Sequence, residues 1–298
     1  MDAKIIAVAN MKGGVGKTAT VVSLAEALAA NGYRVLVIDL DAQANASICL
    51  AGDSLLATLI GRGATIERLL FDQLLGKKLL KLTHVIRGDI SSVWHLDKQL
   101  DIALLPSSPE LRNFEHRLIF ELTRQQMSWE RIVNGLSAVM GMHFATAKKD
   151  HDFILIDCAP GISPLTEVSI RLADLVMVPT IPDFLSTFGL QAFCLTLSDR
   201  GLTDIVRKLA RPPRVLITRR RQMTMHAKTA AILRNEQTAA KPAFDVFETE
   251  IPEAVAIADA LSQIDKYPIF SQKWGPVVVP RLQRLVDEIT EVVDVGRA

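Results

Sequence analysis

The sequence predicts an α/β protein with a doubly wound, mostly parallel sheet flanked by helices. Short apolar runs rich in Val, Ile and Leu alternate with longer helical patterns along the 298 residues, as in strands buried on both faces of a sheet. A glycine-rich loop joins the first apolar run to a helix, and acidic residues end two later runs. No repeat, low-complexity linker or shift in composition divides the chain, so we expect one domain over residues 1–298.

The chain begins with a predicted βαβ unit. A strand is expected near Ile5–Ala9, and a helix over Thr18–Ala30 would end at the Asn31-Gly32 pair. A second strand near Val35–Asp39 gives a unit of about 30 residues, the usual length of this motif.

Residues 54–150 are predicted to form a largely helical excursion around one strand near Ile102–Leu105. Ser108-Pro109-Glu110 has the composition of an N-cap and first turn, and a helix over Leu111–Met127 is expected after it. The stretch Leu74–Leu96 fits no clean period, and we expect it on the surface. Four further strands are expected near Phe153–Asp157, Leu175–Val178, Val215–Thr218 and Phe244–Phe247.

Composition narrows the classes of protein. No apolar stretch approaches the ~20 residues of a membrane-spanning helix. The first apolar run stops at Asn10 and continues into glycines, so it lacks a secretory signal pattern, and we expect a cytoplasmic protein. The three cysteines, Cys49, Cys158 and Cys194, form no CxxC pair and are expected to be buried reduced thiols.

The glycine-rich loop is the strongest chemical signal. Residues 12–18 read Lys-Gly-Gly-Val-Gly-Lys-Thr, the end of a P-loop, although Met11 stands where the strict pattern has its first glycine. Gly13, Gly14 and Gly16 let backbone N–H groups turn inward around a polyphosphate. Lys17 would reach the β- and γ-phosphates of ATP, and the Thr18 hydroxyl would bind Mg²⁺ at the positive end of the following helix. Lys12 either points toward a partner's phosphate or is a solvated surface lysine.

Two predicted strands end in carboxylates. Asp39 and Asp41 follow the second strand, and Asp157 ends the strand near 153–157. Because ligands of open α/β sheets bind at the carboxyl ends of strands, these acids should converge on the phosphate loop. Asp41 could hold an attacking water and Asp157 could hold Mg²⁺ through a bound water. The sequence alone does not separate the roles of Asp39 and Asp41.

Three segments together resemble the ParA/MinD superfamily of deviant-Walker ATPases, most closely its ParA branch, over nearly the whole chain. Residues 10–18, Asn-Met-Lys-Gly-Gly-Val-Gly-Lys-Thr, look like the family's signature-lysine loop. Residues 37–47, Val-Ile-Asp-Leu-Asp-Ala-Gln-Ala-Asn-Ala-Ser, look like its second motif. Residues 153–161, Phe-Ile-Leu-Ile-Asp-Cys-Ala-Pro-Gly, resemble its Walker B strand.

The resemblance implies an ATP-dependent sandwich dimer in which Lys12 reaches the other subunit's nucleotide. It implies that Lys12, Lys17 and Asp41 act in hydrolysis and that Asp41 acts on the attacking water. It further implies slow hydrolysis stimulated by a ParB-like or other cargo-adaptor protein, and a cytoplasmic, nucleoid-associated ATPase. The nucleotide-binding residues that it implies are Lys12, Gly13, Gly14, Val15, Gly16, Lys17, Thr18 and Ala19.

The chain departs from the family pattern at several positions. Ala42 replaces the usual proline, and Ala19 replaces a hydroxyl residue, so the contact to the α-phosphate would come from backbone alone. Glu253 follows Ile251-Pro252 where the family often has arginine. Residues near Arg219, where relatives contact adenine, could not be assigned to the base.

A basic segment suggests non-specific DNA binding. From Arg200 to Lys241 eleven basic residues stand against Asp204 and Glu236, a local balance of +9 in a chain whose total is +1. Such a patch attracts phosphate backbones and releases counterions. The alternative is a solvated surface with some arginines bound to carboxylates. We expect DNA contacts from Arg219, Arg220, Arg221, Lys228 and Arg234.

Of three rival functions, two require residues that can be checked in the sequence. A MinD-like, membrane-associated positioning ATPase would need a basic amphipathic C-terminal helix, but the polar positions there include Asp287, Glu288 and Glu291, so a helix packed on the sheet and no membrane partner are expected. A nitrogenase-type iron protein would need a second cluster cysteine beside Cys158. A binding module that keeps ATP without hydrolysing it is separated from an ATPase only by assay.

Overall fold

The computed structural model describes residues 3–76, 80–198, 211–238, 242–263 and 266–294. Its main sheet has seven strands in the order β5-β2-β6-β1-β7-β8-β9, and every neighbouring pair is parallel. The predicted fold class is therefore confirmed. The strands are β1 (Lys4–Val8), β2 (Val35–Leu40), β5 (Ile102–Leu105), β6 (Phe153–Cys158), β7 (Leu175–Thr180), β8 (Arg214–Arg220) and β9 (Asp245–Pro252).

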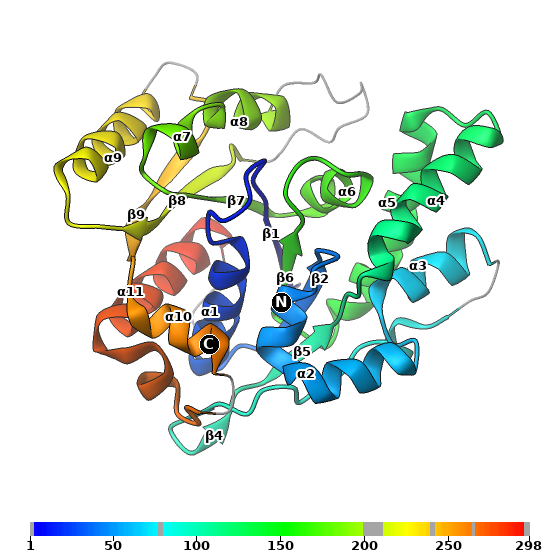
Figure 1. Ribbon diagram of the computed structural model, residues 1–298, viewed down its shortest axis with the longest axis horizontal. Coiled ribbons are helices and arrows are strands. Elements are labelled where there is room, and N and C mark those ends of the chain that lie inside the picture. The colour runs from blue at the N-terminus through cyan, green and yellow to red at the C-terminus, as the bar shows by residue number, and fades with distance from the viewer. Residues whose placement is uncertain (1–2, 77–79, 199–210, 239–241, 264–265, 295–298) are drawn as a thin grey trace.

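Helices cover both faces of the sheet (Figure 1). One face packs against α3 (Ile66–Leu74), α4 (Glu110–Arg124), α5 (Trp129–Ala147), α6 (Pro164–Leu172), α8 (Leu190–Ser198) and α9 (Thr224–Glu236). The other packs against α1 (Lys17–Ala30), α2 (Asn45–Gly61), α10 (Val255–Ser262) and α11 (Phe270–Val292). A short helix, α7 (Phe184–Thr187), follows β7. This double cover explains why the central strands are apolar on both faces.

The register of the central strands brings two carboxylates beside the phosphate loop. In the β2–β6 pair Asp39 lies opposite Asp157, and in the β1–β6 pair Val8 lies opposite Asp157. The phosphate loop leaves β1, the middle strand of the order, directly beside these acids. Crossovers run to both sides of β1, so the loop opens at the point where a doubly wound sheet binds ligands.

Residues 74–96, which were expected on the surface, are exposed in part and buried in part: Trp94 and Leu96 are 46% and 82% exposed. The segment contains a 3₁₀ turn, Leu82–His84, and β3 (Trp94–His95), which pairs with β4 (Lys98–Gln99) in a small hairpin. Leu82, Val85 and Val93 are at most 4% exposed and pack into the two cores. Irregular backbone hides burial from a periodicity argument, because its inward side chains follow no fixed spacing.

Two helix predictions have different outcomes. The helix expected to reach Met127 ends at Arg124. The C-terminal helix packs on the molecule as expected: Leu282, Leu285 and Ile289 of α11 are at most 1% exposed. No helix in the described ranges is long and apolar enough to cross a bilayer.

Candidate nucleotide-binding site

The phosphate loop runs from β1 into α1 and has the backbone geometry that its glycines permit. Gly14 and Gly16 have φ of 75° and 91°, in the left-handed region where a side chain would be strained. Gly16 is also the N-cap of α1. The Thr218 hydroxyl at the end of β8 donates to the Val15 carbonyl at 2.7 Å and fixes the loop against the sheet. The free N–H groups at the start of α1 therefore face an anion-binding space.

Lys17 is the cation of this space. Its side chain reaches back over the loop, where Nζ donates to the Lys12 carbonyl oxygen at 2.9 Å. Burial lowers the pKa of Lys17, and the nearby carboxylates of Asp157 and Asp41 oppose that effect. A polyphosphate would stabilise the charged form in the same way, because it places negative charge beside a partly desolvated ammonium group.

The structure separates Asp39 from Asp41, which the sequence could not do. Asp39 is fully buried, and its carboxylate accepts hydrogen bonds from the Ser47 N–H and hydroxyl at 2.8 and 2.7 Å and from the Asp41 N–H at 3.0 Å. Burial raises the pKa of Asp39 to about 6. Asp41 lies one residue beyond β2 and lines the cavity. Asp39 thus holds the turn that presents Asp41.

Asp157 pairs with the threonine of the loop. The Thr18 hydroxyl donates to Asp157 Oδ2 at 2.8 Å. The other oxygen, Oδ1, is buried and has no hydrogen-bond partner among the described residues. Burial, followed by the proximity of Asp39, raises the pKa of Asp157 well above its ordinary value. An unsatisfied buried carboxylate oxygen beside a hydroxyl group is a donor set that Mg²⁺ could use, because Mg²⁺ prefers oxygen ligands.

The described residues contain no group of three or more His, Cys, Asp or Glu side chains that could hold a metal by themselves. A cation at Thr18 and Asp157 would therefore be shared with a phosphate ligand, which is how Mg²⁺ is usually held in nucleotide sites. The residues present fit Mg²⁺ bound together with a nucleotide.

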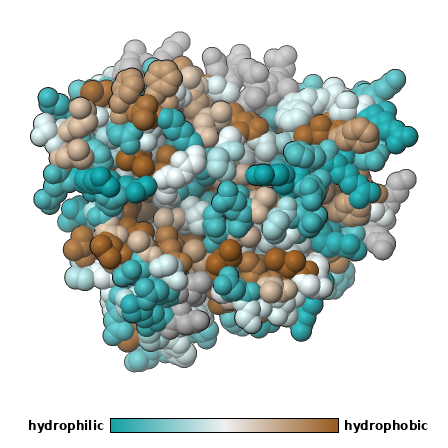
Figure 2. Space-filling model, viewed as in Figure 1, coloured by the Kyte–Doolittle hydropathy of each residue, from teal (hydrophilic) through white to brown (hydrophobic). Residues whose placement is uncertain are grey.

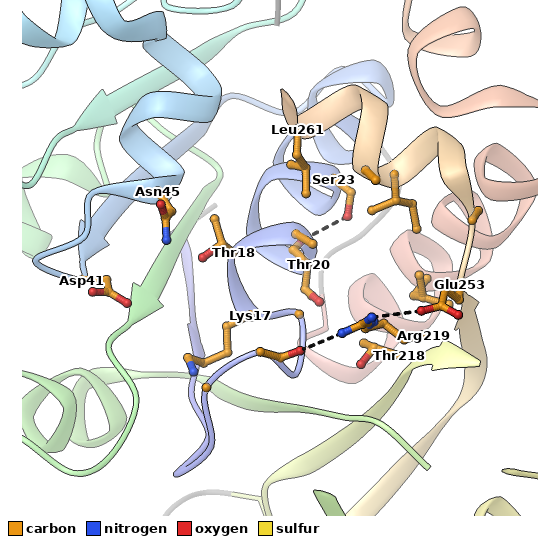
Figure 3. A pocket seen from close by; sticks show the side chains of 18 of the residues that line it. Lys17, Thr18, Thr20, Ser23, Asp41, Asn45, Thr218, Arg219, Glu253 and Leu261 are labelled. Carbon is orange, nitrogen blue, oxygen red and sulfur yellow. Dashed lines mark hydrogen bonds and ion pairs between the residues drawn. The ribbon is translucent and has the colours of Figure 1, made fainter. Parts of the chain in front are cut away.

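A cavity of about 460 Å³ extends from the phosphate loop to α10 (Figure 3). Lys17, Thr18 and Asp41 lie at one end, and Arg219 and Glu253 lie at the other. Its walls include six of the eight expected nucleotide-binding residues: Gly13, Gly14, Gly16, Lys17, Thr18 and Ala19. They do not include Lys12 or Val15, and Val15 is buried.

Other lining residues were not predicted from the sequence. They are Thr20, Ser23, Gln43, Asn45, Pro160, Thr218, Ile251, Pro252, Glu253, Ala254, Ile257, Ala258 and Leu261. Gln43, Asn45 and Pro160 belong to motifs already recognised, and their position in those motifs could have identified them. The residues from β9 and α10 had no such signal, because only the folded chain brings positions 251–261 opposite the start of α1.

Comparisons with known proteins agree with this geometry. A family model described as an AAA domain matches residues 3–204. An uncharacterised protein of Pseudomonas putida is 32% identical over 188 residues, which are 63% of this chain and 60% of that protein. The chromosome-partitioning ATPase Soj of Thermus thermophilus is 30% identical over 259 residues, 86% of this chain and 84% of Soj. This chain belongs to the ParA branch of the ParA/MinD superfamily. The family resemblance read from the motifs is confirmed.

The fold of this ParA-branch protein also matches solved structures. An ATP complex of a McdA variant from Cyanothece aligns with a TM-score of 0.67 at 17% identity, covering 100% of this chain and 98% of McdA. At that identity the likeness establishes the fold alone.

The structure bears on two of the alternative functions, the membrane-associated ATPase and the iron protein. The apolar face of α11 is buried in the core, so this face is not available to a membrane. Cys49, Cys158 and Cys194 are buried thiols outside any disulfide, as expected. Burial raises the pKa of Cys158 to about 12, which disfavours the thiolate that a cluster would need.

Of the five residues expected to bind DNA, the four arginines form ion pairs within the chain. Arg219 and Arg221 pair with Glu253, and Arg220 pairs with Glu250 at 3.0 Å. In α9, Arg234 also pairs with Glu250, at 2.8 Å.

Lys228, on an exposed part of α9, has no ion pair within the described chain. Arg200, Arg207, Lys208, Asp204 and Lys241 lie outside the described residues. Glu250 and Glu253, which lie outside the basic segment 200–241, thus neutralise part of its positive charge. The DNA contacts stay a prediction.

Proposed function

We propose that this protein is an ATP-dependent partitioning or positioning ATPase that binds Mg-ATP, forms a nucleotide-sandwich dimer, and hydrolyses ATP slowly when a cargo-adaptor protein stimulates it. The observation that carries the proposal is the division of the two loop lysines. Lys17 lines the cavity with Thr18 and Asp41, whereas Lys12 does not line it. A lysine of the signature loop that does not line the cavity of its own subunit is available to the nucleotide of another subunit.

Each residue of the cavity has one role in this proposal. Lys17 and the N–H groups of Gly13, Gly14 and Gly16 would bind the phosphates, and the Thr18 hydroxyl would hold Mg²⁺. Asp157, whose Oδ1 has no hydrogen-bond partner among the described residues, would help to hold Mg²⁺ through a water. Mg²⁺, when bound, neutralises charge that develops on the transferred phosphoryl group. Asp41 accepts a hydrogen bond from the attacking water and aligns it with the γ-phosphate.

An exposed apolar surface supports dimerisation beside Lys12. Phe184, Leu185 and Phe188, around α7, are each 72% exposed, and Met11 is 52% exposed. Met11, Lys12 and Phe188 also line a second hollow of about 300 Å³. Figure 2 shows apolar side chains gathered on the upper part of this face, where Figure 1 places α7 and α8. Exposed aromatic clusters of this kind mark protein interfaces.

The proposal places the dimer in the cytoplasm on nucleoid DNA, with a ParB-like or other cargo-adaptor protein as its stimulating partner. Soj of Thermus thermophilus is named a chromosome-partitioning ATPase, and the basic residues near β8 and α9 supply positive charge for phosphate contacts. Pairing two such faces would couple DNA affinity to ATP, because a monomer presents half the charge.

Two substitutions test the division of roles. Asp41→Ala should bind ATP, accumulate as an ATP-bound dimer and hydrolyse ATP far more slowly than wild type. Lys12→Ala should bind ATP with near wild-type affinity and dimerise poorly. Sedimentation velocity with Mg-ATP measures both. A Lys12→Ala protein that dimerises like wild type would remove the role of Lys12 across the interface.

A further inference from the structure

The end of the cavity away from the phosphate loop contains a polar group with no assigned role. If the triphosphate of ATP occupies the loop, as proposed above, the ribose and base must lie between the start of α1 and the segment Ile251–Leu261. Most of this wall is apolar, formed by Ile251, Pro252, Ala254, Ile257, Ala258 and Leu261. An apolar wall can bury a purine face, but it does not satisfy the hydrogen-bond donors of a nucleoside.

Glu253 is the one carboxylate among the described residues that line this end. The neighbouring hydroxyls already use their protons within the chain. Thr218 donates to the Val15 carbonyl at 2.7 Å, and Ser23 donates to the Thr20 carbonyl at 3.3 Å. Glu253 is therefore the anionic acceptor that a nucleoside would meet.

Two arginines hold this carboxylate in place. Arg219 Nη2 and Arg221 Nη2 each donate to Glu253 Oε1 at 3.0 Å, and Arg221 Nε donates to Oε2. The hydrogen bonds from Arg221 and then Arg219 lower the pKa of Glu253 to about 2, so it is an acceptor throughout the physiological range. A carboxylate offers about four lone-pair positions, so three donors leave room for one more.

Arg219 connects Glu253 to the phosphate loop. Its Nη1 donates to the Gly14 carbonyl at 3.4 Å while Nη2 contacts Glu253, so one guanidinium spans the two sides of the cavity (Figure 3). The backbone of Arg219 has φ of 49°, a conformation that a long side chain adopts rarely and at some cost. The Arg219 side chain is half exposed, so its guanidinium lies over the loop at the edge of the cavity.

We propose that Glu253 recognises the nucleoside half of the bound nucleotide by accepting a hydrogen bond from a ribose hydroxyl or from the 6-amino group of adenine. Arg219 and Arg221 are positioning residues for this contact. The ribose hydroxyls and the 6-amino group are both hydrogen-bond donors, so a protein variant does not distinguish them. Nucleotide analogues that each lack one donor do.

The test uses diphosphates, so that hydrolysis does not enter the readout. Calorimetry in Mg²⁺ measures the affinities of ADP, 2′-deoxy-ADP, 3′-deoxy-ADP and purine riboside diphosphate, which lacks the 6-amino group. Wild type should bind at least one analogue about 10-fold more weakly than ADP, and Glu253→Ala should bind that analogue and ADP with similar affinities. Glu253→Gln is a milder second variant that should show an intermediate ratio.

Glu250→Ala is the matched control. Glu250 also pairs with arginines, Arg220 and Arg234, but it does not line the cavity. Its analogue-to-ADP ratios should equal those of wild type. Ratios that are the same in wild type and Glu253→Ala for all three analogues would overturn the role of Glu253 while leaving the nucleotide site intact. A wild type that binds none of the diphosphates would instead overturn the site itself.

Discussion

A buried ion pair ties the helix of the phosphate loop to the C-terminal helix, and removing its lysine should destabilise the protein strongly. Lys273 Nζ of α11 lies 2.5 Å from Glu26 Oε1 of α1, and both side chains are 2% exposed. Trp274 Nε1 donates to the other oxygen of Glu26 at 2.8 Å. Lys273→Met would leave a buried carboxylate without its cation, which costs about 3–5 kcal/mol of unfolding free energy.

The pH dependence of this loss follows from Glu26. Burial raises the pKa of Glu26, and Lys273 opposes the rise, so the pKa should rise further in Lys273→Met. A carboxyl group whose folded pKa lies above its unfolded value adds stability below the unfolded pKa and loses it as pH rises through the folded pKa. The deficit of Lys273→Met should therefore be largest near pH 7 and shrink toward pH 5.

Equilibrium unfolding in urea, followed by circular dichroism and tryptophan fluorescence at both pH values, measures the deficit. The double variant Glu26→Gln/Lys273→Met removes both charges but keeps an acceptor for Trp274, and it should recover most of the lost stability. A deficit below about 1 kcal/mol at pH 7, or one that is the same in the single and double variants, would refute the argument, because a buried unpaired charge cannot cost so little.

Two further predictions concern ligands. Lys17→Ala should weaken Mg-ATP binding about 100-fold or more by calorimetry, since each charge-assisted hydrogen bond contributes roughly 1.5–3 kcal/mol; wild-type affinity would reject the phosphate-loop assignment. Lys228→Glu should weaken retention of the ATP-bound protein on random-sequence duplex DNA and reduce the slope of log affinity against log salt by about 1. An unchanged slope would remove Lys228 from the DNA surface, with Lys266→Glu as a charge-matched control outside the predicted segment.

Sequence patterns located most of the fold and the phosphate-loop end of the cavity. The seven strands fall within a few residues of their predicted positions, because buried parallel strands are apolar without alternation. The phosphate loop is recognisable because its glycine conformations and its Lys17-Thr18 end are local properties of consecutive residues. The α10 side of the cavity has no comparable pattern. In the sequence Ile257 and Leu261 look like ordinary helix residues. Only in the folded chain do they line the same cavity as Ser23.

The sequence by itself determined which carboxylates stand at the strand ends. Only the tertiary structure decided which of them lines the cavity and which is buried. The sequence does not distinguish Asp39 from Asp41. In the structure Asp39 is buried near the end of β2 and accepts three hydrogen bonds, whereas Asp41 lines the cavity. The basic segment likewise acquires its carboxylate partners from Glu250 and Glu253 on the neighbouring strand and the residue after it. Local conformation is encoded by adjacent residues, whereas electrostatic partners depend on strand register and on helices far apart in the chain. Their identity therefore appears only when the sheet has formed.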